Sequence, residues 1–118
     1  QGVVHHPQIV KYLEVARIEF YRHLGISYKI MREEGYEFIF RKINVRYRKP
    51  IYFDEIIDVH VGIAKLANAS FIMGYEIYNQ VNELAVSAEI ELLCAEVNIG
   101  KPTALPPNYH AALESALQ

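Results

Sequence analysis

The feature of this sequence that most constrains its fold is a helical pattern near the N-terminus whose apolar residues cover more than one side. Apolar residues three or four positions apart form one stripe, which comprises Ile9, Tyr12, Leu13, Ala16, Phe20 and Leu24. Further apolar residues widen this stripe, namely Val10, Val15, Ile18 and Tyr21. A helix that is apolar on several sides is normally enclosed by other structure. The pattern therefore predicts a central helix with Gly25 as its C-cap.

After Gly35 the apolar period changes from helical to two, which is typical of half-buried strands. We predict strands at residues 36–47, 57–63, 70–78 and 84–94, with a helical turn at 26–34 and a helix at 108–117. Consecutive strands joined by short turns pair antiparallel. The sequence therefore predicts one α+β domain, residues 1–118, in which an antiparallel sheet wraps around one long central helix.

The alternation within the strands predicts which residues are buried. In the first strand we expect Ile43, Val45 and Tyr47 on a buried face. Near residues 38–40, where the alternation breaks, we expect a bulge or burial on both faces. In the fourth strand we expect the row from Leu84 to Cys94 to face the core, which makes Cys94 inert packing.

The composition excludes several classes of protein. The chain has 118 residues, of which 52% are hydrophobic and 22% charged, so a disordered chain is excluded. A net charge of −2 gives no general electrostatic reason to bind nucleic acid. A single cysteine excludes an internal disulfide framework and a cysteine-based zinc site, and it suits a reducing compartment. No apolar run is long enough for a membrane span, and we expect a cytoplasmic protein.

The residues just before the predicted helix form a candidate electrophilic corner. Gly2 permits unusual backbone conformations, and Pro7 fits the first turn of a helix because its missing N–H would be unpaired there. Free backbone N–H groups and the positive end of the helix dipole therefore gather near His5 and His6. Such a corner is suited to a carbonyl oxygen or another anionic atom.

Several motifs in this order resemble one enzyme family. They are Gln1-Gly2-Val3-Val4-His5-His6, Glu14-x-x-Arg17, Tyr47-x-x-Pro50, Phe53-Asp54-Glu55 and Gly100-Lys101-Pro102-x-x-Leu105-Pro106. Together they resemble the hot-dog fold acyl-CoA thioesterases of the 4-hydroxybenzoyl-CoA thioesterase and YbgC type. The resemblance implies thioester hydrolysis without a cofactor, since coenzyme A is part of the substrate. It also implies a homodimer or homotetramer whose sheets pair edge to edge.

The same resemblance implies an aspartate three residues before the motif glycine, two positions upstream of Gln1, where the first strand of the fold would also lie. It further implies that the backbone N–H of His6 polarises the thioester carbonyl and that Glu14 lines the site as a general base. An ion pair of Glu14 with Arg17 is the alternative. Substrate contacts are expected from Val4, His5, Pro7, Tyr47 and Ser70, and contacts to the phosphates of coenzyme A from Lys65 and Lys101.

Three other functions fit parts of the sequence. A hot-dog acyl dehydratase would use a histidine before the helix and a glutamate on it, but the Phe-Pro-Gly that usually follows the histidine is absent after His6. A non-catalytic acyl-CoA-binding module would follow if no carboxylate lies upstream of Gln1. A nucleic-acid-binding face at residues 47–49 is the third alternative. Adjacent histidines without further ligands do not indicate a metal site.

Overall fold

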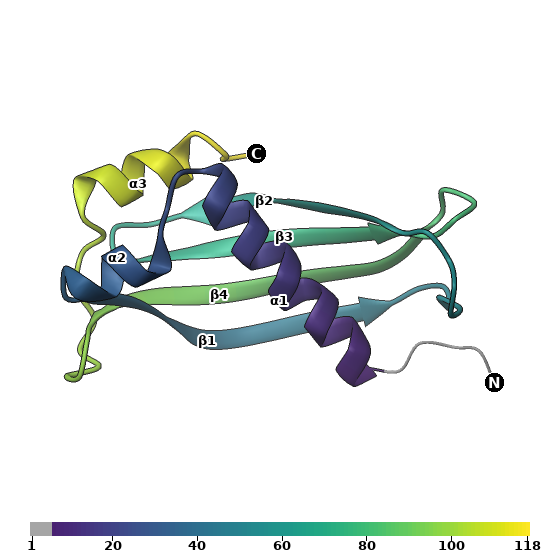
Figure 1. Cartoon of the computed structure of the whole chain (residues 1–118), viewed down its shortest axis with the longest axis horizontal. Coiled ribbons are helices and arrows are strands. Elements are labelled where there is room, and N and C mark those ends of the chain that lie inside the picture. The colour runs from purple at the N-terminus through teal and green to yellow at the C-terminus, as the bar shows by residue number, and fades with distance from the viewer. Residues whose placement is uncertain (1–5) are drawn as a thin grey trace.

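The computed structural model describes residues 6–118, and the side chains of residues 8–118. The elements in chain order are α1 (His6–His23), α2 (Tyr28–Glu33), β1 (Tyr36–Tyr47), β2 (Asp58–Leu66), β3 (Ser70–Tyr78), β4 (Leu84–Glu96) and α3 (Pro107–Glu114). Figure 1 shows α1 crossing one face of the sheet diagonally, while α2 and α3 lie at one end of it. The predicted α+β architecture, with one long helix on an antiparallel sheet, is confirmed.

The strands form one antiparallel sheet in the order β1-β4-β3-β2. The prediction that all consecutive strands pair was wrong for β1 and β2, which lie at opposite edges of this sheet. The link between them is too long for a hairpin turn, because ten residues separate Tyr47 from Asp58 and Pro50 interrupts them. This link crosses the end of the sheet instead, and β4 pairs with β1 along its whole length.

Helix α1 ends just before Gly25, as the sequence predicts. Gly25 has a φ of 77°, a left-handed conformation that favours glycine. The N–H of Gly25 donates to the carbonyl of Arg22, and the N–H of Ile26 donates to the carbonyl of Tyr21. These two bonds make a Schellman motif, which satisfies the last carbonyls of the helix. The motif turns the chain into α2, whose N-cap is Ser27.

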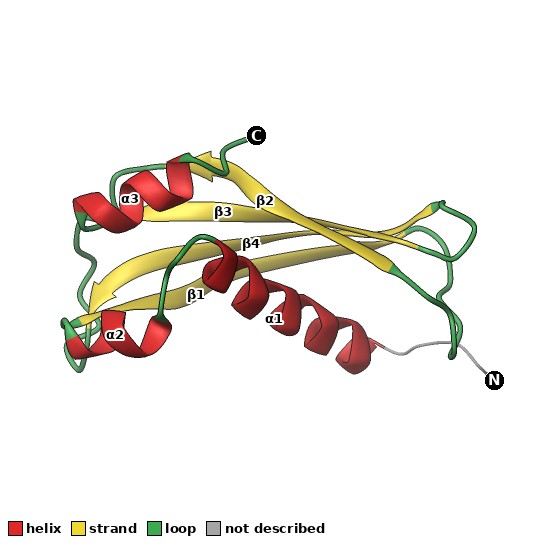
Figure 2. Cartoon of the chain, turned by 45° about the horizontal axis from the view of Figure 1, so that its top comes forward, coloured by secondary structure: helices red, strands yellow, loops and turns green. Residues whose placement is uncertain are grey.

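The core lies between α1 and the sheet face that α1 crosses, and Figure 2 shows this arrangement from a second angle. The predicted inward row of β4 is confirmed, because its residues from Val86 to Cys94 are buried. Burial raises the pKa of the Cys94 thiol, which therefore stays protonated and packs as an apolar group. Met31 of α2 and Leu113 of α3 close one end of the core.

Two predictions of burial were wrong. Val15 and Ile18 of α1 are 61% and 51% exposed, because the sheet covers one side of the helix and no second layer covers it among residues 8–118. Ile43 and Tyr47 of β1 are also about half exposed, although their strand forms as predicted. The predicted bulge is confirmed, since the register of β1 shifts between Phe40 and Lys42. The face shared by α1 and β1 is consequently an open apolar surface.

Candidate functional site

The start of α1 lies at the end of the sheet where β1 ends and β2 begins (Figure 1). The helix begins at His6, close to where the sequence places it, so its first backbone N–H groups have no partner within the helix. The predicted substrate contacts at Val4 and His5 lie outside the described residues. So do the side chains of His6 and Pro7.

A groove follows the side of α1 that faces β1, and it consists of two adjoining hollows. The N-terminal hollow, of about 370 Å³, extends from Val10 to Arg17 on the helix. The C-terminal hollow, of about 630 Å³, extends from Arg17 past the end of α1 to Tyr28. Arg17 and Phe40 line both hollows and therefore mark the point where they join.

The walls of the C-terminal hollow are mainly aromatic and aliphatic. They come from the last turns of α1, the turn into α2, the start of α2, the first half of β1 and β4, and include Ile18, Ile26, Tyr28, Phe38, Phe40 and Leu92. The ring of Phe38 packs edge-on against Tyr21 at 5.7 Å and against Phe71 at 4.9 Å between centroids. These contacts fix the inner wall of the hollow in a well-packed part of the core.

Two polar groups in this apolar setting were missed by the sequence analysis. The Nε of Arg17 and the hydroxyl of Tyr21 are buried and have no hydrogen-bond partner. Burial raises the pKa of Tyr21, although the nearby Arg17 opposes the shift, so its hydroxyl stays neutral. The signal was present in the sequence, because Arg17 continues the four-residue spacing of Ile9, Leu13 and Tyr21 along the buried side of α1.

Glu14 lines the N-terminal hollow, but its surroundings differ from those predicted. The carboxylate was expected to act as a general base or to pair with Arg17, and its side chain is exposed. The ion pairs among residues 8–118 include neither Glu14 nor Arg17. The guanidinium of Arg17 instead stacks on Phe40, with its Cζ 4.4 Å from the ring centroid. Glu14 is therefore available to the groove without a competing partner among the described side chains.

The other predicted site residues fall at two ends of the sheet. Tyr47 ends β1 near the start of α1, and burial of part of its ring raises its pKa. Ser70 begins β3 at the opposite end, half-buried. Tyr47 lies across β4 from Ile77, and Ile77 is seven positions from Ser70 along β3, so the two sites are about 24 Å apart along the strands. One chain does not bring Tyr47 and Ser70 together.

The predicted phosphate contacts lie at the same end as Ser70. Lys65 is opposite Ile72 near the end of β2, and Lys101 follows the end of β4; both are exposed. The carbonyl of Lys101 accepts a hydrogen bond from the N–H of Glu96, which fixes the backbone there. Lys65 and Lys101 are thus far from the start of α1 in the same chain.

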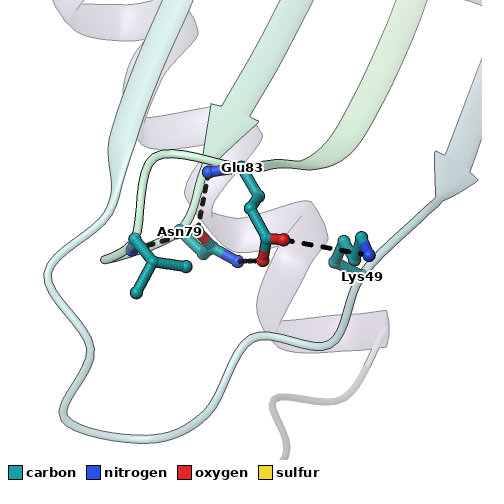
Figure 3. Close-up of polar contacts among 4 residues, drawn as sticks. Lys49, Asn79 and Glu83 are labelled. Atoms are coloured by element: carbon teal, nitrogen blue, oxygen red, sulfur yellow. Dashed lines mark hydrogen bonds and ion pairs between the residues drawn. The ribbon is translucent and has the colours of Figure 1, made fainter.

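The loops near the start of α1 are held by a polar cluster, shown in Figure 3. The side-chain carbonyl of Asn79 accepts from the N–H groups of Val81 and Glu83, and its amide donates to the carboxylate of Glu83. The same carboxylate lies 3.9 Å from the Nζ of Lys49. This cluster ties the turn between β3 and β4 to the chain that leaves β1, and it partly neutralises the charge of Lys49.

The described part of the chain has neither a metal-binding cluster nor a membrane-spanning helix. No group of three or more His, Cys, Asp and Glu side chains there is arranged to hold a metal ion. None of the helices between residues 6 and 118 combines the length and the apolar character needed to cross a membrane.

Comparison with known proteins identifies the family. A family model described as the thioesterase-like superfamily matches residues 1–113. The chain belongs to this superfamily. The acyl-CoA thioester hydrolase YbgC of Escherichia coli O6:H1 is 32% identical to this chain over 110 residues, which are 93% of this chain and 82% of YbgC.

Solved structures agree with this assignment. The crystal structure of a DHNA-CoA thioesterase from Staphylococcus aureus matches with a TM-score of 0.88 and 32% identity, covering 97% of this chain and 78% of that one. A 1,4-dihydroxy-2-naphthoyl-CoA thioesterase from Synechocystis matches with a TM-score of 0.86 over 95% of this chain and 83% of that one; at 18% identity this match supports the fold alone. The predicted hot-dog fold and the predicted resemblance to thioesterases are both confirmed.

Proposed function

We propose that this protein hydrolyses an acyl-CoA thioester to a free acid and coenzyme A, with the thioester carbonyl held at the start of α1. The observation that carries the proposal is the position of that helix start, which lies at one end of an apolar groove in a chain of the thioesterase-like superfamily. Unpaired N–H groups at a helix start stabilise negative charge, and the groove can hold an acyl chain.

The chemistry needs few groups. Water attacks the thioester carbon, the carbonyl oxygen becomes an oxyanion beside the backbone N–H of His6, and the C–S bond breaks to release the thiol of coenzyme A. Loss of one such donor typically slows a reaction by about 10²–10³-fold. The aspartate expected two positions before Gln1 activates the water, and Glu14, exposed in the N-terminal hollow, orients it. No cofactor takes part, because coenzyme A belongs to the substrate.

The site is completed by a second copy of the chain. Ser70, Lys65 and Lys101 lie too far from Tyr47 to reach one thioester within a single protomer. β1 is an edge strand of the described sheet and carries exposed apolar residues, Phe40 and Ile43. Such an edge favours pairing with another strand. In a homodimer or homotetramer, Val4, His5, Pro7 and Tyr47 of one protomer contact the acyl end, and Ser70, Lys65 and Lys101 of another contact the coenzyme A end.

We also place the enzyme in the cytoplasm, since the one cysteine is a buried free thiol and a free thiol suits a reducing compartment.

Steady-state release of free thiol from a panel of acyl-CoAs tests the proposal. The panel includes short, long and aromatic acyl groups, and the wild-type protein is compared with a variant in which the expected upstream aspartate is changed to asparagine. We expect turnover that collapses in the variant. If every thioester binds and none is cleaved, the protein is an acyl-CoA-binding module instead.

A further inference from the structure

The ring of Phe40 lies where the two hollows of the groove meet, and Arg17 covers it. Both residues line the N-terminal hollow of about 370 Å³ and the C-terminal hollow of about 630 Å³. The Cζ of Arg17 lies 4.4 Å from the centroid of the Phe40 ring, and the Nε of Arg17 is buried. One side chain from the helix and one from the sheet thus meet across the groove and divide it.

A bulge in β1 places Phe40 at this point. Phe38, two residues earlier on the same face of the strand, is buried against Phe71, whereas Phe40 is 50% exposed. The register of β1 against β4 shifts directly after Phe40, which leaves Arg41 as the extra residue; its guanidinium lies 3.0 Å from the carboxylate of Glu91 on β4. Bulges redirect neighbouring side chains and are frequent beside active sites. The bulge therefore keeps the Phe40 ring in the groove instead of in the core.

We propose that the Phe40 ring is a barrier that ends the acyl pocket, so that it limits the length of the acyl chain that the enzyme binds. The acyl chain then occupies the N-terminal hollow from the start of α1 up to Phe40 and does not enter the C-terminal hollow. Val10, Leu13 and Ile43 give this path an apolar lining, which suits a hydrocarbon chain. This inference rests on the proposed function, which places the thioester carbonyl at the start of α1.

The distance from the helix start to the barrier sets the length limit. From His6 to Arg17 the helix advances eleven residues, or about 17 Å at the usual rise. Helical side chains lean towards the N-terminus by up to about one turn, so the stack of Arg17 on Phe40 lies about 12–17 Å from the helix start. An extended chain covers roughly 1.2 Å per bond. A decanoyl chain of about 11 Å therefore ends before the barrier, whereas an octadecanoyl chain of about 20 Å has to pass it.

The test measures kcat/KM for decanoyl-CoA and octadecanoyl-CoA, both below the concentrations at which they form micelles. For wild type we expect octadecanoyl-CoA to be no better a substrate than decanoyl-CoA, because methylenes beyond the barrier bury no further surface in the pocket. Phe40→Ala removes the ring and joins the two hollows, and each methylene that then enters the C-terminal hollow is worth about 4-fold in affinity. This variant should raise the ratio of kcat/KM for octadecanoyl-CoA to that for decanoyl-CoA by at least about 10-fold.

Two further substitutions make the test graded. Phe40→Leu leaves a smaller barrier and should raise this ratio by less than Phe40→Ala does, whereas Phe40→Trp enlarges the barrier and should lower the ratio. Phe53→Ala is the matched control and should leave the ratio unchanged, because Phe53 is similarly exposed, at 57%, and lines neither hollow. Circular dichroism checks folding, and the leucine and tryptophan variants carry the test if Phe40→Ala does not fold. A wild-type ratio well above one, or a ratio that stays constant across the Phe40 variants, overturns the proposal.

Binding measurements separate this proposal from the thioesterase activity itself. The decyl and octadecyl thioethers of coenzyme A have no carbonyl to hydrolyse, so calorimetric titration with them needs no turnover. If wild type cleaves no thioester, but Phe40→Ala binds the octadecyl thioether at least about 10-fold more tightly than wild type does, the proposed function falls and the barrier stands. If thioesters are cleaved and neither the kcat/KM ratio nor this affinity responds to Phe40→Ala, the proposed function stands and the barrier is wrong.

Discussion

Replacing Tyr21 with phenylalanine should stabilise the free protein. The Tyr21 hydroxyl is buried without a hydrogen-bond partner, and an unpaired buried group of this kind costs about 1–3 kcal/mol. Phenylalanine keeps the ring and its edge-on contact with Phe38, so the packing of the core is retained. Taking the low end, we expect the free energy of unfolding to rise by about 1 kcal/mol, which corresponds to a Tm increase of roughly 4 °C for a domain of this size.

The same substitution at Tyr109 is the matched control and should have the opposite sign. Tyr109 is a buried residue of α3, and its hydroxyl donates to a carboxylate oxygen of Glu34 at the end of α2. Burial and this bond raise the pKa of Tyr109 to about 12. Tyr109→Phe removes the bond and should cost about 1 kcal/mol.

Urea unfolding and thermal scans of both variants without ligand provide the measurement. The reasoning is refuted if Tyr21→Phe destabilises the protein as much as Tyr109→Phe does, since the Tyr21 hydroxyl must then have a partner.

Three further predictions concern the core, the pH dependence and the assembly. Phe71→Ala removes a fully buried ring and should lower the free energy of unfolding by about 3–5 kcal/mol in urea titrations, whereas a loss below 1 kcal/mol would contradict the described core. The N–H groups of Tyr52 and Gln80 donate to the Glu55 carboxylate and hold its pKa below 4.5. The contribution of Glu55 to the free energy of unfolding is therefore present above about pH 4.5 and is lost as pH falls through the folded-state pKa. Glu55→Gln should flatten the acid side of the stability profile measured from about pH 3 to 7, and an unchanged slope would argue against these bonds. Ile43→Asp places a charge on the exposed apolar edge strand β1 and should shift the protein towards the monomer in light scattering. A wild-type protein that is itself monomeric at micromolar concentration would contradict this prediction.

The parts of the fold that depend on local patterns could be predicted from the sequence. The strand Ser70–Tyr78 has the predicted bounds, and Gly25 ends α1 because only a residue that tolerates positive φ fits there. The pairing of β1 with β4 could not be predicted, since strand order depends on contacts far apart in the sequence. The prediction that Ile18 is buried was wrong for a related reason. A helical pattern shows which residues are apolar, but not how many sides of the helix other elements cover.

The candidate site was predictable only where a motif marked it. The start of α1 at His6 agrees with the glycine, histidine and proline pattern before it. Arg17 and Tyr21 were missed because Arg17 was considered only as an alternative ion-pair partner of Glu14, and Tyr21 only as one of the apolar residues of the helix. Whether such a pair forms depends on the competing ring of Phe40, which comes from a strand more than twenty residues away.

The central claim is that the thioester carbonyl binds at the start of α1 with its acyl group in the groove beside β1. A crystal structure of the protein with a ketone analogue of an acyl-CoA, in which a methylene replaces the sulfur, tests this most directly. We predict the ketone oxygen at about 2.7–3.1 Å from a backbone nitrogen at the start of α1, with the acyl chain running past Val10 towards Arg17. An analogue bound with its carbonyl away from that helix start, or with its acyl chain outside the groove, would contradict the account.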